Sequence, residues 1–132
     1  MWQNDRTTQS MGMKIISVAP GEAVLTMTVQ EHMLNGQGSA HGGMLFTMAD
    51  SCFGFACNTY NQFAVAQQCS INYVAPGKLG DVLTATGREV HRAGRGGVYD
   101  IEIRNQDNTL IALFRGTCRT VKGQHLPEEI HD

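Results

Sequence analysis

The sequence predicts an α+β fold in which an antiparallel β-sheet wraps around one long central α-helix. One stretch, residues 42–58, is apolar over most of its length, and its polar residues recur at helical spacing. The other segments are rich in Val, Ile, Leu and Thr and are separated by turn residues, which indicates strands. Consecutive strands joined by short turns pair antiparallel, so the order β-β-α-β-β-β-β predicts one sheet curled around a single helix.

Before the helix, the chain predicts a β-hairpin. Residues 13–18 read as a strand that ends at Pro20-Gly21, and apolar side chains alternate along residues 23–30. Residues 2–11 are polar and fit either a short helix or a mobile arm. The glycine-containing loop 31–41 then leads into the helix.

The predicted helix, residues 42–58, is roughly 25 Å long at 1.5 Å per residue. One narrow polar stripe follows i, i+4, i+7, i+11 spacing: Thr47, Ser51, Gly54 and Asn58. Asp50 lies at the margin of this stripe, and the rest of the circumference is apolar. Such a helix must be covered on more than one side, so we expect the sheet on one flank and room for a second subunit on another.

Four strands are predicted after the helix. The first ends at Ala75-Pro76-Gly77, and residues 105–108 turn the chain between the last two. Their approximate bounds are residues 65–74, 81–91, 99–104 and 109–121. The last ten or so residues form a polar tail. Since no repeat or linker interrupts the pattern, we expect a single domain over 1–132, with its core at about 11–121.

Composition narrows the function classes. With 132 residues, 42% of them hydrophobic, the chain has the size of one domain that buries about two thirds of its unfolded surface. A net charge of −2 with 17% charged residues does not indicate a nucleic-acid-binding protein. No apolar run is long enough to span a bilayer, and the N-terminus has no signal-peptide core. We therefore expect a soluble, cytoplasmic protein without a membrane or nucleic-acid partner.

The cysteines and histidines do not form a metal-binding pattern. The cysteines occur singly in apolar stretches, without the close pairs of a zinc knuckle or thioredoxin-type site. We expect all four to be buried, reduced packing residues: Cys52, Cys57, Cys69 and Cys118. The five histidines are scattered. We predict no metal site.

Three short motifs carry a family resemblance. They are Leu34-Asn35-Gly36, Ala40-His41-Gly42-Gly43 and Ala49-Asp50, followed later by the segments VAPG, VYDIEI and LIALFRGT. With this spacing the chain, from Met11 to about Val121, resembles hot-dog fold thioesterases of the phenylacetate-degradation (PaaI) type. The resemblance implies an acyl-CoA thioesterase that hydrolyses (hydroxy)phenylacetyl-CoA-type thioesters to free acid and CoA in phenylacetate degradation. It implies no cofactor, because coenzyme A is part of the substrate.

The glycines at the start of the helix suit the chemistry of thioester hydrolysis. The reaction needs a polarised carbonyl, and a helix N-terminus offers free N–H groups at its positive end. Gly42 or Gly43 fits this place because a backbone without Cβ can approach the thioester oxygen closely. The resemblance implies that the Gly42 N–H is the donor and that His41 and Asn35 hold the loop and the bound groups. Gly43 is taken as a substrate-binding residue.

Asp50 is the second catalytic candidate. It lies about two turns inside the helix, too deep to cap it, and Asp is a poor residue for a helix interior. The resemblance implies that this acid either attacks the thioester or activates a water, and the sequence leaves both mechanisms open. It also implies a homotetramer, a dimer of dimers, in which the loop of one subunit faces the Asp50 of another.

Further residues are candidates for binding the substrate. The CoA phosphates require positive charge, which Lys78 or the arginines around the turn at residues 91–97 supply, among them Arg92 and Arg95. A solvated hairpin end is the alternative for these residues. Many relatives have Arg where this chain has Ala75, so one phosphate contact is missing or supplied elsewhere. Ser51 is a candidate for orienting water or product.

Each assignment has a structural alternative. Asp50 is alternatively part of a solvated or interface-facing stripe. His41 is alternatively an ordinary residue at the start of the helix, and Asn35 with Gly36 is alternatively a turn pair. Two other functions remain possible for this fold: a non-catalytic acyl-CoA-binding hot-dog protein, and a hot-dog hydratase or dehydratase. The hydratases use a His-centred pattern with prolines in the loop, which this chain lacks. The joint presence of the three motifs favours the thioesterase.

Overall fold

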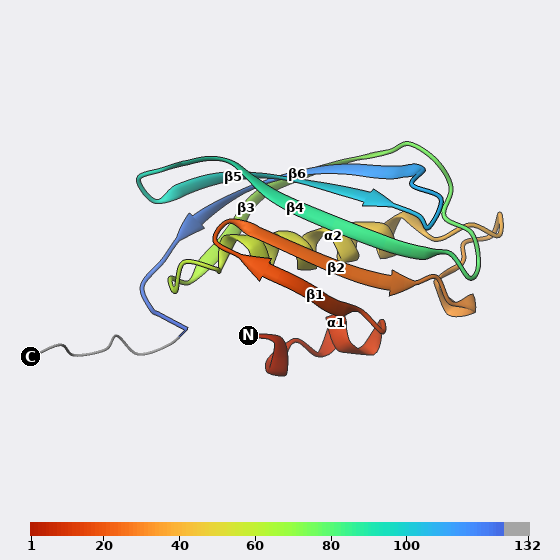
Figure 1. Cartoon of the computed structure of the whole chain (residues 1–132), viewed down its shortest axis with the longest axis horizontal. Helices are drawn as coiled ribbons and strands as arrows, with labels where there is room; N and C mark the ends of the chain where they lie inside the picture. Colours follow the sequence, from red (N-terminus) through yellow and green to blue (C-terminus); the bar gives the residue numbers. More distant parts are fainter. Residues whose placement is uncertain (126–132) are drawn as a thin grey trace, which may run out of the picture.

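Alternating side chains build the middle of the sheet. Every second residue is buried along most of β2 (Glu22–Thr28), β5 (Gly96–Arg104) and β6 (Leu110–Thr120), and along the first half of β4 (Val82–Ala93). The computed structural model describes residues 1–125 and adds two edge strands, β1 (Lys14–Ala19) and β3 (Ala64–Tyr73). All neighbouring strands pair antiparallel, and the sheet curves around one long helix, α2 (Gly42–Cys57) (Figure 1). The predicted α+β, hot-dog architecture is confirmed.

The strand order departs from the sequence-based expectation at β3. The order is β1-β2-β4-β5-β6-β3, so the expected pairing of consecutive strands fails between β3 and β4. The connection over residues 74–81 is longer than a hairpin loop. It joins the edge strand β3 to β4, which is separated from β3 in the sheet by β5 and β6. Along the way, Ala40 N–H donates to Gly77 O at 2.8 Å and Gly80 N–H donates to Val29 O at 2.9 Å. These bonds tie the crossing segment to the loop before α2.

Helix α2 packs against the sheet along one buried face. The buried residues of the helix are Leu45, Met48, Ala49, Cys52, Phe53, Phe55, Ala56 and Cys57, and the Phe55 ring also lies beside Trp2 of the N-terminal segment. Two glycines let the helix approach closely: a Cβ on Gly116 would lie 2.6 Å from the Phe53 ring, and one on Gly87 would lie 3.0 Å from Cys52 Sγ. A Cβ atom at Gly116 would therefore clash with the Phe53 ring and push the helix away from the sheet, and one at Gly87 would crowd Cys52.

The N-terminal segment folds back onto α2. Residues Trp2–Asn4 form a 3-10 helix and Arg6–Ser10 form α1, so the short-helix interpretation of residues 2–11 is correct. The fully buried Thr8 places its hydroxyl 2.8 Å from the hydroxyl of Ser51. Within residues 1–125, no helix is long and apolar enough to cross a membrane.

All four cysteines are free thiols, but not all are buried as expected. Cys52, Cys57 and Cys118 lie in the core. The expectation was wrong for Cys69, which is half-buried because β3 is an edge strand with largely exposed side chains. Residues 126–132 of the predicted polar tail lie outside the described residues, so the single domain over 1–132 stays a prediction.

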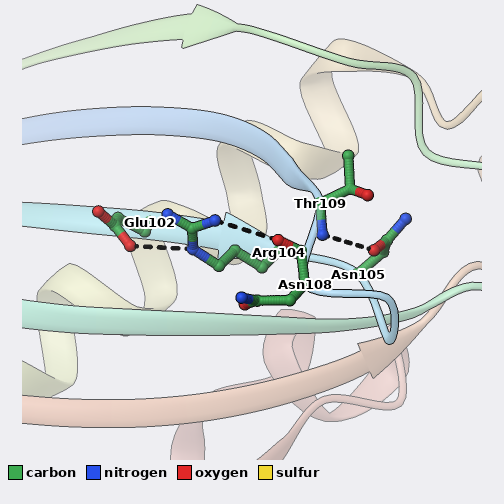
Figure 2. Close-up of polar contacts among 5 residues, drawn as sticks. All are labelled: Glu102, Arg104, Asn105, Asn108 and Thr109. Atoms are coloured by element: carbon green, nitrogen blue, oxygen red, sulfur yellow. Dashed lines mark hydrogen bonds and ion pairs between the residues drawn. The ribbon is translucent and has the colours of Figure 1, made fainter.

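The predicted turn at residues 105–108 joins β5 to β6 and is fixed by its own side chains (Figure 2). Asn105 Oδ1 accepts from the Thr109 N–H at 3.0 Å. Arg104 Nη1 donates to Asn108 O at 3.1 Å, and Arg104 Nε lies 3.2 Å from Glu102 Oε2. These contacts hold the loop from which Gln106 reaches the crossing segment.

Asp81 connects this turn to the crossing segment. Its carboxylate accepts from Gln106 Nε2 and from the Lys78 N–H, both at 2.9 Å, and the side chain is buried. These two bonds hold the pKa of Asp81 below its ordinary value of 3.8.

We predict that Asp81→Ala lowers the free energy of unfolding by about 1–3 kcal/mol at pH 7, because two donors lose their partner. The part of this stability that depends on the negative charge of Asp81 is fully present above the ordinary pKa of the carboxyl group. It disappears as the pH falls through the lowered pKa of the folded state. Urea unfolding from pH 7 to pH 3 should therefore show the difference narrowing below pH ~4. Asp107→Ala, in the exposed part of the same turn, is the control. An equal loss in both variants would contradict the role of Asp81.

Candidate active site

The loop before α2 is shaped by Asn35. Its Oδ1 accepts from the Gln37 N–H at 2.9 Å and from the Ser39 N–H at 3.1 Å, and its own N–H donates to Ser39 O at 2.7 Å. This arrangement is an Asx turn closed by a backbone bond. The geometry assigns Asn35 at least the structural role that was the alternative interpretation of this residue.

His41 caps the N-terminus of α2. Its Nδ1 accepts from the Gly43 N–H at 2.9 Å, and its N–H donates to Met33 O at 2.7 Å. Because Nδ1 is an acceptor, the neutral ring carries its proton on Nε2, on a side chain exposed to solvent. Among the described residues, no hydrogen bond involves the Gly42 N–H. The first turn of the helix therefore offers one free backbone donor at its positive end.

Tyr73, the last residue of β3, covers this turn. Its hydroxyl donates to Gly42 O at 3.0 Å, and a Cβ on Gly42 would lie 3.0 Å from the ring carbon Cζ. Sequence reasoning missed Tyr73 because its contact with Gly42 depends on where β3 lies in the sheet. A cavity of about 410 Å³ opens beside this contact, and Asn35, Ser39, Gly42, Leu45, Tyr73 and Pro76 are among its lining residues.

Asp50 lies on the outer face of α2, away from the loop. Asp50 comes eight positions after Gly42, which is roughly 12 Å along the helix axis. Its Oδ1 lies 4.0 Å from Cys69 Sγ on β3. Partial desolvation and, to a smaller extent, the negative charge of Asp5 raise the pKa of Asp50 above 3.8. A raised pKa in a surface acid fits a general base or nucleophile.

The candidate phosphate-binding residues lie near opposite ends of α2. Lys78 lies beside the loop, where it forms an isolated β-bridge with Ser39. Arg92 stacks over the Tyr60 ring at 3.7 Å and lines a small pocket with Arg95, at the end of the helix marked by Cys57.

In one chain, the structure therefore brings together Asn35, His41, Gly42, Gly43 and Lys78. It places Asp50, Arg92 and Arg95 elsewhere. The Ser51 hydroxyl is engaged with Thr8. No group of three or more His, Cys, Asp or Glu side chains within residues 1–125 is arranged to hold a metal ion.

Comparison with known proteins gives a consistent family assignment. The model of the thioesterase superfamily matches residues 37–112. The chain is 48% identical to the acyl-coenzyme A thioesterase PaaI of Escherichia coli (strain K12), over 93% of this chain and 88% of that protein.

Solved structures agree with the sequence comparison. The structure of the E. coli PaaI protein, from the phenylacetic acid degradation operon, superposes with a TM-score of 0.92 at 48% identity and covers 94% of this chain and 90% of that one. A Streptococcus mutans UA159 protein bound to acetyl-CoA superposes with a TM-score of 0.82 at 34% identity, covering 85% of this chain and 90% of that chain.

We predict that the Asp50 carboxyl titrates above pH 3.8 and that Asp5→Asn lowers its pKa, because removing a nearby negative charge makes ionisation easier. Asn retains the ability to cap α1, so the helix should stay in place. Carboxyl-carbon NMR titration of Asp50 measures the pKa directly, with Asp107→Asn as a control that leaves it unchanged. If Asp5→Asn leaves the Asp50 pKa where it was, or raises it, Asp5 does not act on this acid.

Proposed function

Because this chain belongs to the thioesterase superfamily and is a thioester hydrolase of acyl-CoA, we propose that it acts on (hydroxy)phenylacetyl-CoA-type thioesters. The products would be the free acid and CoA, within phenylacetate degradation. The identity to a PaaI thioesterase supports this substrate class. The observation that supports thioester hydrolysis at this site is the free Gly42 N–H at the start of α2, beside a cavity.

The loop and the helix N-terminus would polarise the thioester. The Gly42 N–H donates to the carbonyl oxygen, and the positive end of α2 stabilises the negative charge that develops there. Asn35 and His41 hold this donor in place through the Asx turn and the helix cap. The exposed Nε2–H of His41 is available to a bound group. Gly43 completes the turn by donating to His41.

Asp50 would supply the attacking oxygen, as a nucleophile or by activating a water. Both mechanisms use the ionised carboxylate, so activity should rise with pH through the raised pKa of Asp50. The leaving group is a thiolate, which departs without a strong general acid. Neither mechanism therefore requires another titrating side chain in the site.

The acid would come from a second copy of the chain. Reacting atoms must approach to about 3 Å, whereas roughly 12 Å of helix separates Asp50 from the Gly42 of its own chain. We propose that the two copies meet along strand β3, since it is an edge strand with exposed side chains, among them the apolar Val65. It also borders both halves of the site, through Tyr73 at Gly42 and Cys69 at Asp50. We propose a dimer that shares its sites, and a tetramer built from two such dimers.

Positive side chains would hold the CoA phosphates. Lys78 lies beside the loop of its own chain. Arg92 and Arg95 lie at the far end of α2, so they would reach a loop only from the second copy. Ser51 is bonded to Thr8 and remains the weakest of the binding candidates. The cytoplasmic location remains a prediction from the sequence.

We predict that Asp50→Asn reduces kcat/KM for phenylacetyl-CoA by about 10²–10⁴-fold, because the amide neither attacks nor accepts a proton. The thermal midpoint and the oligomeric state should stay unchanged, since Asn has the size and shape of Asp. Thiol release from a panel of acyl-CoAs measures the effect, with Asp107→Asn as the control.

Turnover unchanged in Asp50→Asn would refute its catalytic role. Tight binding of acyl-CoAs by the wild-type chain, without release of CoA from any of them, would favour the non-catalytic binding protein instead.

A further inference from the structure

We propose that the ring of Tyr73 makes this site selective for aromatic acyl groups. The inference rests on the proposed function and identifies the residue that sets its acyl preference. Tyr73 is neither part of the loop motif nor of α2. It reaches the site only because β3 lies at the edge of the sheet, next to β6.

The ring is fixed at two points. Its backbone belongs to β3, and its hydroxyl donates to Gly42 O at 3.0 Å. A Cβ on Gly42 would lie 3.0 Å from Cζ, 3.1 Å from the hydroxyl oxygen and 3.3 Å from Cε1, so the ring edge rests directly on the Gly42 backbone. A ring held in this way loses little conformational entropy when a ligand binds to it.

Part of the ring remains free for a ligand. Tyr73 is 53% exposed and lines the cavity of about 410 Å³ beside the loop. The cavity has one apolar side, formed by Ala40, Leu45, Val74 and Pro76, and one polar side, formed by Asn35, Gln37 and Ser39 of the loop. An aromatic platform with apolar neighbours suits an acyl group better than it suits a charged one.

The position of the Tyr73 ring relative to the reacting carbonyl determines which part of the substrate the ring contacts. A thioester whose oxygen accepts from the Gly42 N–H has its acyl carbons next to the Gly42 backbone, which the Tyr73 ring covers. A phenyl group one carbon from the carbonyl then comes within the 4.5–7 Å centroid separation of aromatic pairs. Such a pair favours the aryl group over an alkyl group of similar size by about 2- to 12-fold.

The hydroxyl has a separate effect. It binds the carbonyl of the Gly42–Gly43 peptide, whose N–H donates to His41 Nδ1 at 2.9 Å. One peptide group therefore links Tyr73 to His41. Loss of the hydroxyl should loosen this turn for every substrate alike, whereas loss of the ring should penalise aryl substrates selectively.

The test is kcat/KM for phenylacetyl-CoA relative to hexanoyl-CoA in the wild type, Tyr73→Phe and Tyr73→Leu. We expect the wild type to prefer phenylacetyl-CoA. Tyr73→Phe should keep that ratio, while kcat/KM falls by the same factor for both thioesters. Tyr73→Leu should lower the ratio by about 2- to 12-fold. If the Leu variant does not fold, Tyr73→Met provides the same comparison.

A ratio that stays the same in Tyr73→Leu, or falls equally in Tyr73→Phe, overturns the inference and leaves the thioesterase proposal standing. Equal rates of the wild type on both thioesters do the same. A wild-type chain that hydrolyses neither thioester overturns the proposed function and this inference with it.

Discussion

Helix α2 fixes the distance between the two proposed reactive groups, the Gly42 N–H and the Asp50 carboxylate. Its buried face is held against the sheet, and the missing side chains of Gly116 and Gly87 let Phe53 and Cys52 pack closely there. A helix packed in this way cannot bend so that its first turn meets an acid more than two turns later. The Gly42 N–H and the Asp50 carboxylate of one chain are therefore held apart, and the proposed chemistry requires two chains.

Strand β3 lies beside both Gly42 and Asp50. The crossing segment connects this strand to β4. β3 lies at the edge of the sheet, next to β6, and does not form a hairpin with β4. From there it presents Tyr73 at the helix N-terminus and Cys69 beside the acid. An edge strand with exposed apolar side chains is a place where chains pair unless something covers it. A second copy of the chain would cover this edge and complete the site.

The sequence predicts the local features of this arrangement well. Helical spacing and alternation locate α2, the first hairpin and the turn at residues 105–108, because these signals depend on neighbouring residues. The loop motif likewise identifies residues that the structure brings together around Gly42. Strand β3 was placed next to the wrong neighbour, because pairing between distant segments leaves no local signal. The contact of Tyr73 with Gly42 and the exposure of Cys69 follow from that placement and were missed for the same reason.

Complementation between two defective chains tests the shared site most directly. Gly42→Val brings a side chain against Tyr73 and blocks the loop, while Asp50→Asn removes the acid. Each variant alone should be inactive. Refolded together in equal amounts, they should regain roughly a quarter of the wild-type activity, because half the dimers are mixed and each mixed dimer has one intact site. Mixed dimers that form without regaining activity, or a monomer as active as the assembly, would contradict the account.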